Sequence, residues 1–178
     1  SFLNLVYFSN DVDDPADIWT IDGSLNTLSD RPGMDSQKSD ALGLKFQVEN
    51  SLSKFQILFS ETDTNVIFSF DADWGNPQSH FPYVYDYFSE TLRNRQTSSL
   101  EFRFLSKPQT AKAGNIEWVF GYSIFEIDES NTKNDVGAYG DSSDSSDIFR
   151  SESTFTSDYS SESKSLFGNL DYLFTDKI

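Results

Sequence analysis

The alternation of apolar and polar residues with a period of two constrains this chain more than any other feature. In "TSSLEFRFLSK" (97–107), Leu100, Phe102 and Phe104 fall on one face of an extended strand, and polar residues fall on the other. A second segment, "SDALGLKFQVE" (39–49), repeats the pattern. Because helical periodicity is hard to find, the sequence predicts an all-β fold.

Six alternating segments predict an antiparallel up-and-down sheet of about six long strands. We expect these strands at about 1–9, 39–49, 54–70, 83–105, 115–127 and 148–175. The third segment changes phase, because Phe55, Ile57 and Phe59 are out of step with Val66 and Phe68. This change predicts either a bulge or a change of environment near "ETDTN".

The connections alternate between long acidic segments and shorter segments. Long ones are expected at about 10–38, 71–82 and 128–147, and the short ones contain Lys, Pro or Gly, as at Lys54, Lys107 and Lys112. In an up-and-down sheet this order places all long loops at one end. That asymmetry and the length of the strands favour a transmembrane β-barrel segment. Aromatic residues at the ends of apolar stretches favour it too, because such rings sit well at bilayer interfaces; they are Trp118, Tyr122, Tyr172 and Phe174. A secreted soluble β-sandwich that binds carbohydrate remains the alternative, with the aromatic faces as its core.

Composition excludes several functions. The formal net charge of −16 argues against nucleic-acid binding, which needs a basic footprint. With no cysteine and a single histidine, His80, the chain offers no thiolate nucleophile or histidine metal cluster. No glycine-rich phosphate loop or G-x-S-x-G motif is present, so we expect no catalysis and no cofactor.

The segments "RNRQTSSLEFRFLS", "IEWVFGYSIFE" and "SLFGNLDYLFTDKI" resemble consecutive strands of the TonB-dependent receptors of Gram-negative outer membranes. The resemblance covers most of the chain. It implies a barrel of about 22 strands closed by a plug domain, which imports a scarce nutrient such as an iron-siderophore, cobalamin or a sugar when the TonB system pulls on the plug. The implied partners are outer-membrane lipid, the rest of the barrel, the plug and a small-molecule ligand.

The chain departs from that family in size. It has about six strands, no plug domain and no TonB-binding segment, and its first residues, "SFLNLVYFSN", look like a strand rather than a signal peptide. We therefore interpret residues 1–178 as one partial barrel domain, an internal piece of about a quarter of such a barrel. Its open edges would need neighbouring strands.

The segment "DADWGNPQSHFPYVY" (71–85) is the candidate ligand-binding segment, because it combines stacking rings with carboxylates in a mouth loop. The candidate residues are Asp71, Asp73, Trp74, Tyr83 and Tyr85. The alternative is a surface turn whose aromatic rings lie at a membrane interface.

Charged residues supply two further hypotheses. One phase of the fourth strand is expected to face the barrel lumen and to form either a permeation path or a structural charge ladder; it contains Arg93, Arg95, Glu101 and Arg103. The acidic clusters could bind a hard cation through oxygen ligands, but their spacing does not match a calcium loop, so no metal is predicted. These clusters contain Asp13, Asp14, Asp141, Asp144 and Asp147.

Overall fold

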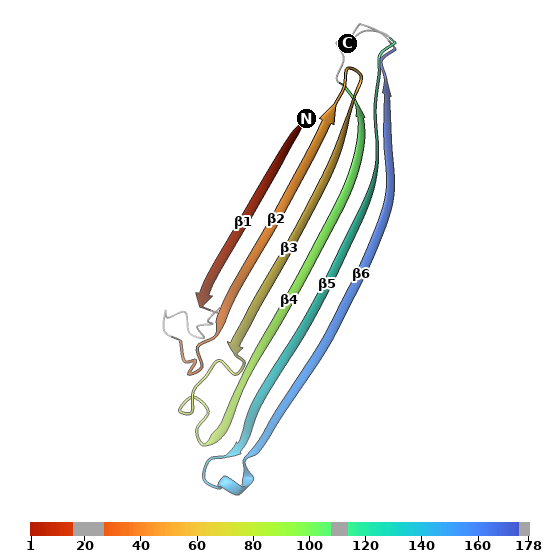
Figure 1. Cartoon of the computed structure of the whole chain (residues 1–178). Coiled ribbons are helices and arrows are strands. Elements are labelled where there is room, and N and C mark those ends of the chain that lie inside the picture. The colour runs from red at the N-terminus through yellow and green to blue at the C-terminus, as the bar shows by residue number, and fades with distance from the viewer. Residues whose placement is uncertain (16–26, 108–113, 175–178) are drawn as a thin grey trace.

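A computed structural model describes residues 1–15, 27–107 and 114–174, which form six strands and one short 3-10 helix. The strands are β1 (Phe2–Pro15), β2 (Met34–Glu49), β3 (Ser53–Asp71), β4 (Tyr83–Ser106), β5 (Ile116–Asp141) and β6 (Phe149–Tyr172), and η1 (Ser145–Asp147) precedes β6. Each strand pairs antiparallel with the next, so the sheet order is β1 to β6 (Figure 1). The predicted all-β, up-and-down sheet is confirmed.

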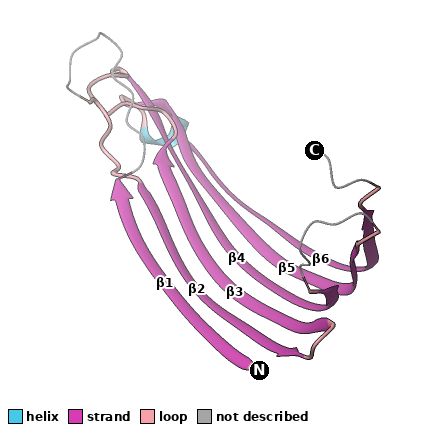
Figure 2. Ribbon diagram, turned by 90° about the horizontal axis from the view of Figure 1, so that it is seen from above, coloured by secondary structure: helices cyan, strands magenta, loops and turns pink. Residues whose placement is uncertain are grey.

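The sheet is a single curved layer that does not close into a barrel. Seen from above, its strands follow the wall of an open gutter, with β1 and β6 at the two edges (Figure 2). Both edge strands therefore keep one side without a ladder partner among the described residues. Long edges of this kind are templates for pairing with further strands.

The strands extend further into the acidic segments than the sequence predicted. β1 continues to Pro15 and β2 starts at Met34, while β5 continues to Asp141, so residues 128–141, predicted as loop, are strand. Backbone pairing with β4 and β6 holds this polar stretch extended although it lacks apolar alternation. Lys112, Lys177 and residues 16–26 of the first acidic segment lie outside the described residues.

The predicted bulge in the third strand is wrong, and the alternative, a change of environment, explains the phase change. The pairing of β3 with both neighbours runs without a skipped residue from one end of β3 to the other. Phe59 therefore lies on one face of the sheet, and Val66 and Phe68 lie on the opposite face nearer the loops.

The described residues contain almost no hydrophobic core. Ala138 is the one hydrophobic residue classed as buried, at 5% exposure, because no second layer covers the sheet. A β-sandwich needs a second sheet against its apolar face, and the described strands supply only one sheet.

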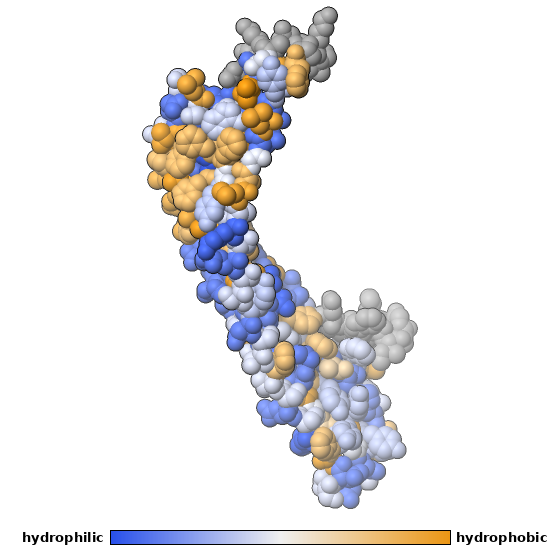
Figure 3. All heavy atoms as spheres, turned by 90° about the vertical axis from the view of Figure 1, so that its right-hand side faces the viewer, coloured by the Kyte–Doolittle hydropathy of each residue, from blue (hydrophilic) through white to orange (hydrophobic). Residues whose placement is uncertain are grey.

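Apolar side chains instead form a continuous band across one face of all six strands, which we call the apolar band. Its rows follow from the pairing register, in which directly opposed residues share a face. The band consists of Leu3, Leu5, Leu44, Phe46, Val48, Phe55, Ile57, Phe59, Leu100, Phe102, Phe104, Ile116, Trp118, Phe120, Tyr122, Ile124, Leu166, Leu170 and Tyr172. Figure 3 shows hydrophobic residues gathered on the convex side of the bowed sheet, toward its tight-turn end.

The length of the band along the strands can be compared with the apolar belt of outer-membrane barrels. Along β5 it runs from Ile116 to Ile124, about 27 Å at ~3.4 Å per residue. A strand tilt of ~40° reduces this length to about 20 Å of height, comparable with the belt of about 25 Å in outer-membrane barrels. Trp118 stacks on Phe104 near the tight turns, with ring centroids 6.1 Å apart.

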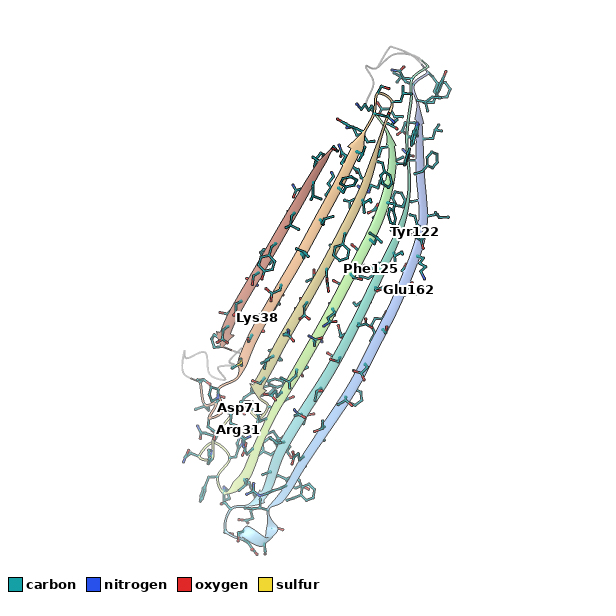
Figure 4. The ribbon with its side chains drawn as sticks, in the orientation of Figure 1. Arg31, Lys38, Asp71, Tyr122, Phe125 and Glu162 are labelled. Carbon is teal, nitrogen blue, oxygen red and sulfur yellow. The ribbon has the colours of Figure 1, made fainter. Side chains whose placement is uncertain are left out.

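The band ends abruptly toward the loops. In the next row on the convex face, Tyr7 and Leu42 align with Glu61 and Glu126 through successive strand pairs. The Tyr7 hydroxyl donates a hydrogen bond of 2.6 Å to Oδ1 of Asp40, so this ring has an apolar body and a polar tip at the boundary. In Figure 4, Tyr122 lies within the band and Glu162 lies closer to the loop end.

The polar residues of β4 that share the apolar phase lie beyond this boundary. Ser98 belongs to the boundary row, and Gln96 and Asn94 follow in the next two rows toward the loops. In the described part of the chain, no helix is long and apolar enough to span a membrane.

Candidate functional site

The long connections meet at one end of the sheet, the lower end in Figure 1. The amide of Asp30 donates a hydrogen bond of 3.0 Å to the carbonyl of Gly75, which joins the connection before β2 to the one after β3. The amide of Ser142 donates a hydrogen bond of 2.9 Å to the carbonyl of Pro82, which joins the connection after β5 to the connection before β4. These segments therefore form one structured rim.

Asp71 and Asp73 hold the rim together. Asp71 is 4% exposed, and its Oδ2 accepts hydrogen bonds from Ser29 Oγ at 2.6 Å and from the amide of Asp30 at 3.2 Å. The Asp73 side chain is 2% exposed, and it accepts from the amides of Gly75 at 2.9 Å and Tyr87 at 2.6 Å. Their oxygens are engaged within the protein, and direct ligand contact by either carboxylate stays a prediction.

An ion pair fixes the convex side of the rim. Arg31 Nη2 donates to Asp86 Oδ2 at 2.7 Å, and its guanidinium carbon lies 5.8 Å from the centre of the Phe88 ring. Burial, and next the nearby carboxylate of Asp71, raise the pKa of Asp30 above its usual value. Figure 4 shows Arg31 and Asp71 close together at the loop end of the sheet.

Tyr83 and Tyr85 lie on the surface of the rim. They are 63% and 49% exposed, and both border a hollow of about 560 Å³ that is also lined by His80, Tyr139 and Asp147. Trp74, the fifth predicted residue, is 48% exposed and has a backbone φ of 55° in the connection between β3 and β4. The structure thus brings three of the five predicted residues together, because Asp73, Tyr83 and Tyr85 also line a second, smaller hollow of about 160 Å³.

The predicted charge ladder lies on the concave face, opposite the apolar band. Arg93, Arg95, Glu101 and Arg103 share this face because they occupy alternate positions of β4, out of phase with Phe102. Their projection into a lumen remains a prediction.

Each arginine of the ladder has a partner. Arg95 Nε donates to Glu129 Oε2 at 2.5 Å, and Arg93 Nε donates to Asn131 Oδ1 at 2.8 Å. Nearer the tight turns, Arg103 donates to both oxygens of Glu101 at 2.6 and 3.0 Å. Such pairing is typical of a polar wall. Each guanidinium of the ladder already donates to a side chain of the protein, so the ladder does not mark a specific anion site.

The acidic connection before β6 folds on itself. Asp141 Oδ1 accepts from the amide and hydroxyl of Ser143 at 2.8 and 2.7 Å, and Asp144 Oδ1 accepts from the amide and hydroxyl of Ser146 at 2.9 and 2.6 Å. Within the described ranges, no group of three or more acidic or histidine side chains is placed to hold a metal ion.

These turns predict an effect of pH. Hydrogen bonds from Ser143 and Ser146 lower the pKa of Asp141 and of Asp144, respectively, below the usual value of an aspartate. A lowered folded-state pKa means that the stabilisation is present above pH ~4 and is lost as the pH falls through the folded-state pKa. We expect the amide NMR resonances of Ser143 and Ser146 to move in that acidic window and to titrate no longer in Asp141→Asn and Asp144→Asn, respectively. Titration near neutral pH would contradict this account.

The sequence prediction missed Tyr139 and Phe149, and it included His80 in the candidate segment 71–85 without naming it as a site residue. Tyr139 lies directly opposite Tyr85 in the β4–β5 ladder, and Phe149 lies opposite Tyr139 in the β5–β6 ladder. A signal was present, because continuing the pairing of the two strands through 128–141 would have placed Tyr139 beside Tyr85. Treating that stretch as a loop hid the contact.

The chain was compared with known proteins in three ways. No family model matches it, and neither the curated proteins nor the solved structures contain a match.

Proposed function

We propose that this chain is a segment of the barrel wall of an outer-membrane transport receptor of the TonB-dependent kind. The observation that carries the proposal is the apolar band on the convex face of a one-layer sheet, with charged side chains on the concave face. This arrangement is typical of a barrel wall with lipid outside and water inside. In water the apolar band would be exposed to solvent, and so large an exposed apolar surface is unfavourable.

The other features support the same function. The free edges of β1 and β6 would pair with the remaining strands of the barrel, and the concave ladder of Arg93 and Arg95 would face the lumen and its plug domain. The structured rim would be the extracellular mouth, where a small-molecule nutrient is captured before import powered by the TonB system. No catalytic step and no cofactor belong to this function.

The soluble carbohydrate-binding sandwich is the weaker candidate. It would require a second sheet over Leu44, Phe59 and Leu100, and the described strands build one sheet only.

Fractionation tests the proposal. The chain should be expressed in its longest natural reading frame in a Gram-negative host, and membranes should be separated with and without detergent. We expect the product in the outer membrane, soluble only with detergent, and with gel migration that changes on heating. A soluble, monomeric and cooperatively folded product of this segment alone would contradict the proposal.

A further inference from the structure

Two neighbouring groups of aromatic rings lie on the concave side of the rim, and together we call them the aromatic row. Tyr85 packs against Tyr87 with ring centroids 4.9 Å apart, and against His80 at 5.3 Å. On the neighbouring strands Tyr139 packs against Phe149 at 5.3 Å. Tyr85 and Tyr139 are directly opposed in the β4–β5 ladder and both line one hollow, so the two groups lie side by side on one face of three strands.

The row is both held in place and open to solvent. The Tyr87 ring lies over Gly137, where an added Cβ would come within 2.3 Å of the ring, so this glycine makes room for the aromatic side chain. Tyr85, Tyr139 and Phe149 are 49%, 50% and 56% exposed. Rings that are fixed by neighbours and still half exposed lose little entropy when a ligand covers them.

The hollow beside the row combines ring surfaces with oxygen atoms. Tyr83 and Asp147 line it together with members of the row, and the hollow measures about 560 Å³. Tyrosine offers an apolar ring and a hydroxyl group that donates and accepts, and a carboxylate accepts from hydroxyl donors. A sugar ring matches this surface, since it has an apolar C–H face for stacking and hydroxyl groups around its edge.

The charges around the hollow select against anions. Its lining includes Asp141 and Asp147 and no Lys or Arg. The cations of the rim are placed elsewhere, because Arg31 pairs with Asp86, and both line a separate hollow together with Arg150. With a net charge of −16 on the chain, a phosphate, sulfate or uronate group would meet repulsion at this position.

We propose that the aromatic row and its hollow bind a neutral oligosaccharide, with sugar rings stacked on Tyr85, Tyr139 and Phe149. The inference rests on the proposed function, because it names the ligand class of the mouth of that receptor. An open row that crosses three strands fits consecutive sugar units better than it fits a compact ligand.

A glycan array tests the inference. The product of the longest natural reading frame, solubilised in detergent micelles and fluorescently labelled, is applied to printed glycans that include neutral oligosaccharides and matched sulfated and uronate-containing ones. We expect binding to neutral glycans only. Tyr85→Ala and Tyr139→Ala should each weaken binding to the best neutral glycan by about tenfold or more, because rigid tyrosines in the centre of a contact carry much of its free energy.

Two controls keep the result specific. Phe155→Ala removes another exposed ring of the same face of β6, outside the row, and should leave binding unchanged. Tyr139→Phe should retain most of the binding if stacking dominates, and it guards against misfolding of the alanine variant. Binding to no glycan, stronger binding to the anionic members, or equal loss in Phe155→Ala would overturn the inference. The array tests only the sugar site, so the absence of glycan binding would not contradict the proposed receptor, which the fractionation tests separately. Conversely, a soluble chain that binds neutral glycans would contradict the proposed receptor and support the sugar site.

Discussion

Phe120→Arg is expected to destabilise the protein in a lipid bilayer by about 2–4 kcal/mol, the cost of a cation on the lipid face of a barrel near the bilayer midplane. Phe120 lies in the middle of the apolar band on β5 and is 53% exposed in the sheet itself. Since no second layer covers the ring, the cost should come mainly from lipid rather than from lost protein packing. The measurement is reversible unfolding by denaturant of the product of the longest natural reading frame, inserted into vesicles.

The depth dependence of this penalty gives the control. Ile124→Arg, at the loop-side margin of the band, should cost about 0–1 kcal/mol, because arginine there reaches the interface. Ser130→Arg lies on the same strand and face, but three rows further toward the loops, and should change stability by less than about 0.5 kcal/mol. Equal penalties at all three positions would contradict a lipid-facing band.

Asp73→Ala should open the rim, with a local loss of about 2 kcal/mol. The carboxylate is almost fully buried and accepts two backbone amides, those of Gly75 and Tyr87. Hydrogen bonds to a charged acceptor contribute about 1.5–3 kcal/mol, and the variant leaves both amides without that acceptor. Hydrogen exchange should show faster exchange at Gly75 and Tyr87, while amides of the apolar band keep their protection.

Asp144→Ala is the matched control for this change. Asp144 also accepts from a backbone amide, but only within its own exposed turn, from Ser146. We expect faster exchange at Ser146 and none of the rim opening. If Asp73→Ala leaves exchange at Tyr87 unaltered, the carboxylate does not hold the rim, and a direct ligand contact would become the better explanation for its position.

Local pattern was sufficient where one face of a strand is apolar. The alternation around Leu44 and Phe102 predicted two long strands and the faces of their side chains. It could do so because successive side chains of a strand point to opposite faces, so a pattern with a period of two fits only an extended strand. The same reasoning placed Arg93 and Arg103 on a common polar face. It failed for residues 128–141, because 128–135 are polar on both faces and the extended conformation there depends on pairing with β4 and β6.

The candidate site shows the same division. The sequence marked Tyr83 and Tyr85 as surface aromatic residues near a loop, and both border the hollow. It could not assign Asp73 to the amide of Tyr87, because that bond depends on how the connection between β3 and β4 folds back. Nor could it bring Phe149 to Tyr139 without the register of the β5–β6 ladder.

The sequence by itself determined the all-β class, the two-faced strands and the concentration of negative charge in the long connections, because these properties are carried by residues close together in the chain. Only the tertiary structure decided that the apolar residues of six strands align in one band and that rings from β4, β5 and β6 meet at the rim. The reason is physical: a strand's pattern fixes which face a side chain takes, whereas its neighbours across the sheet are fixed by register, which is set by pairing over the whole length of two strands.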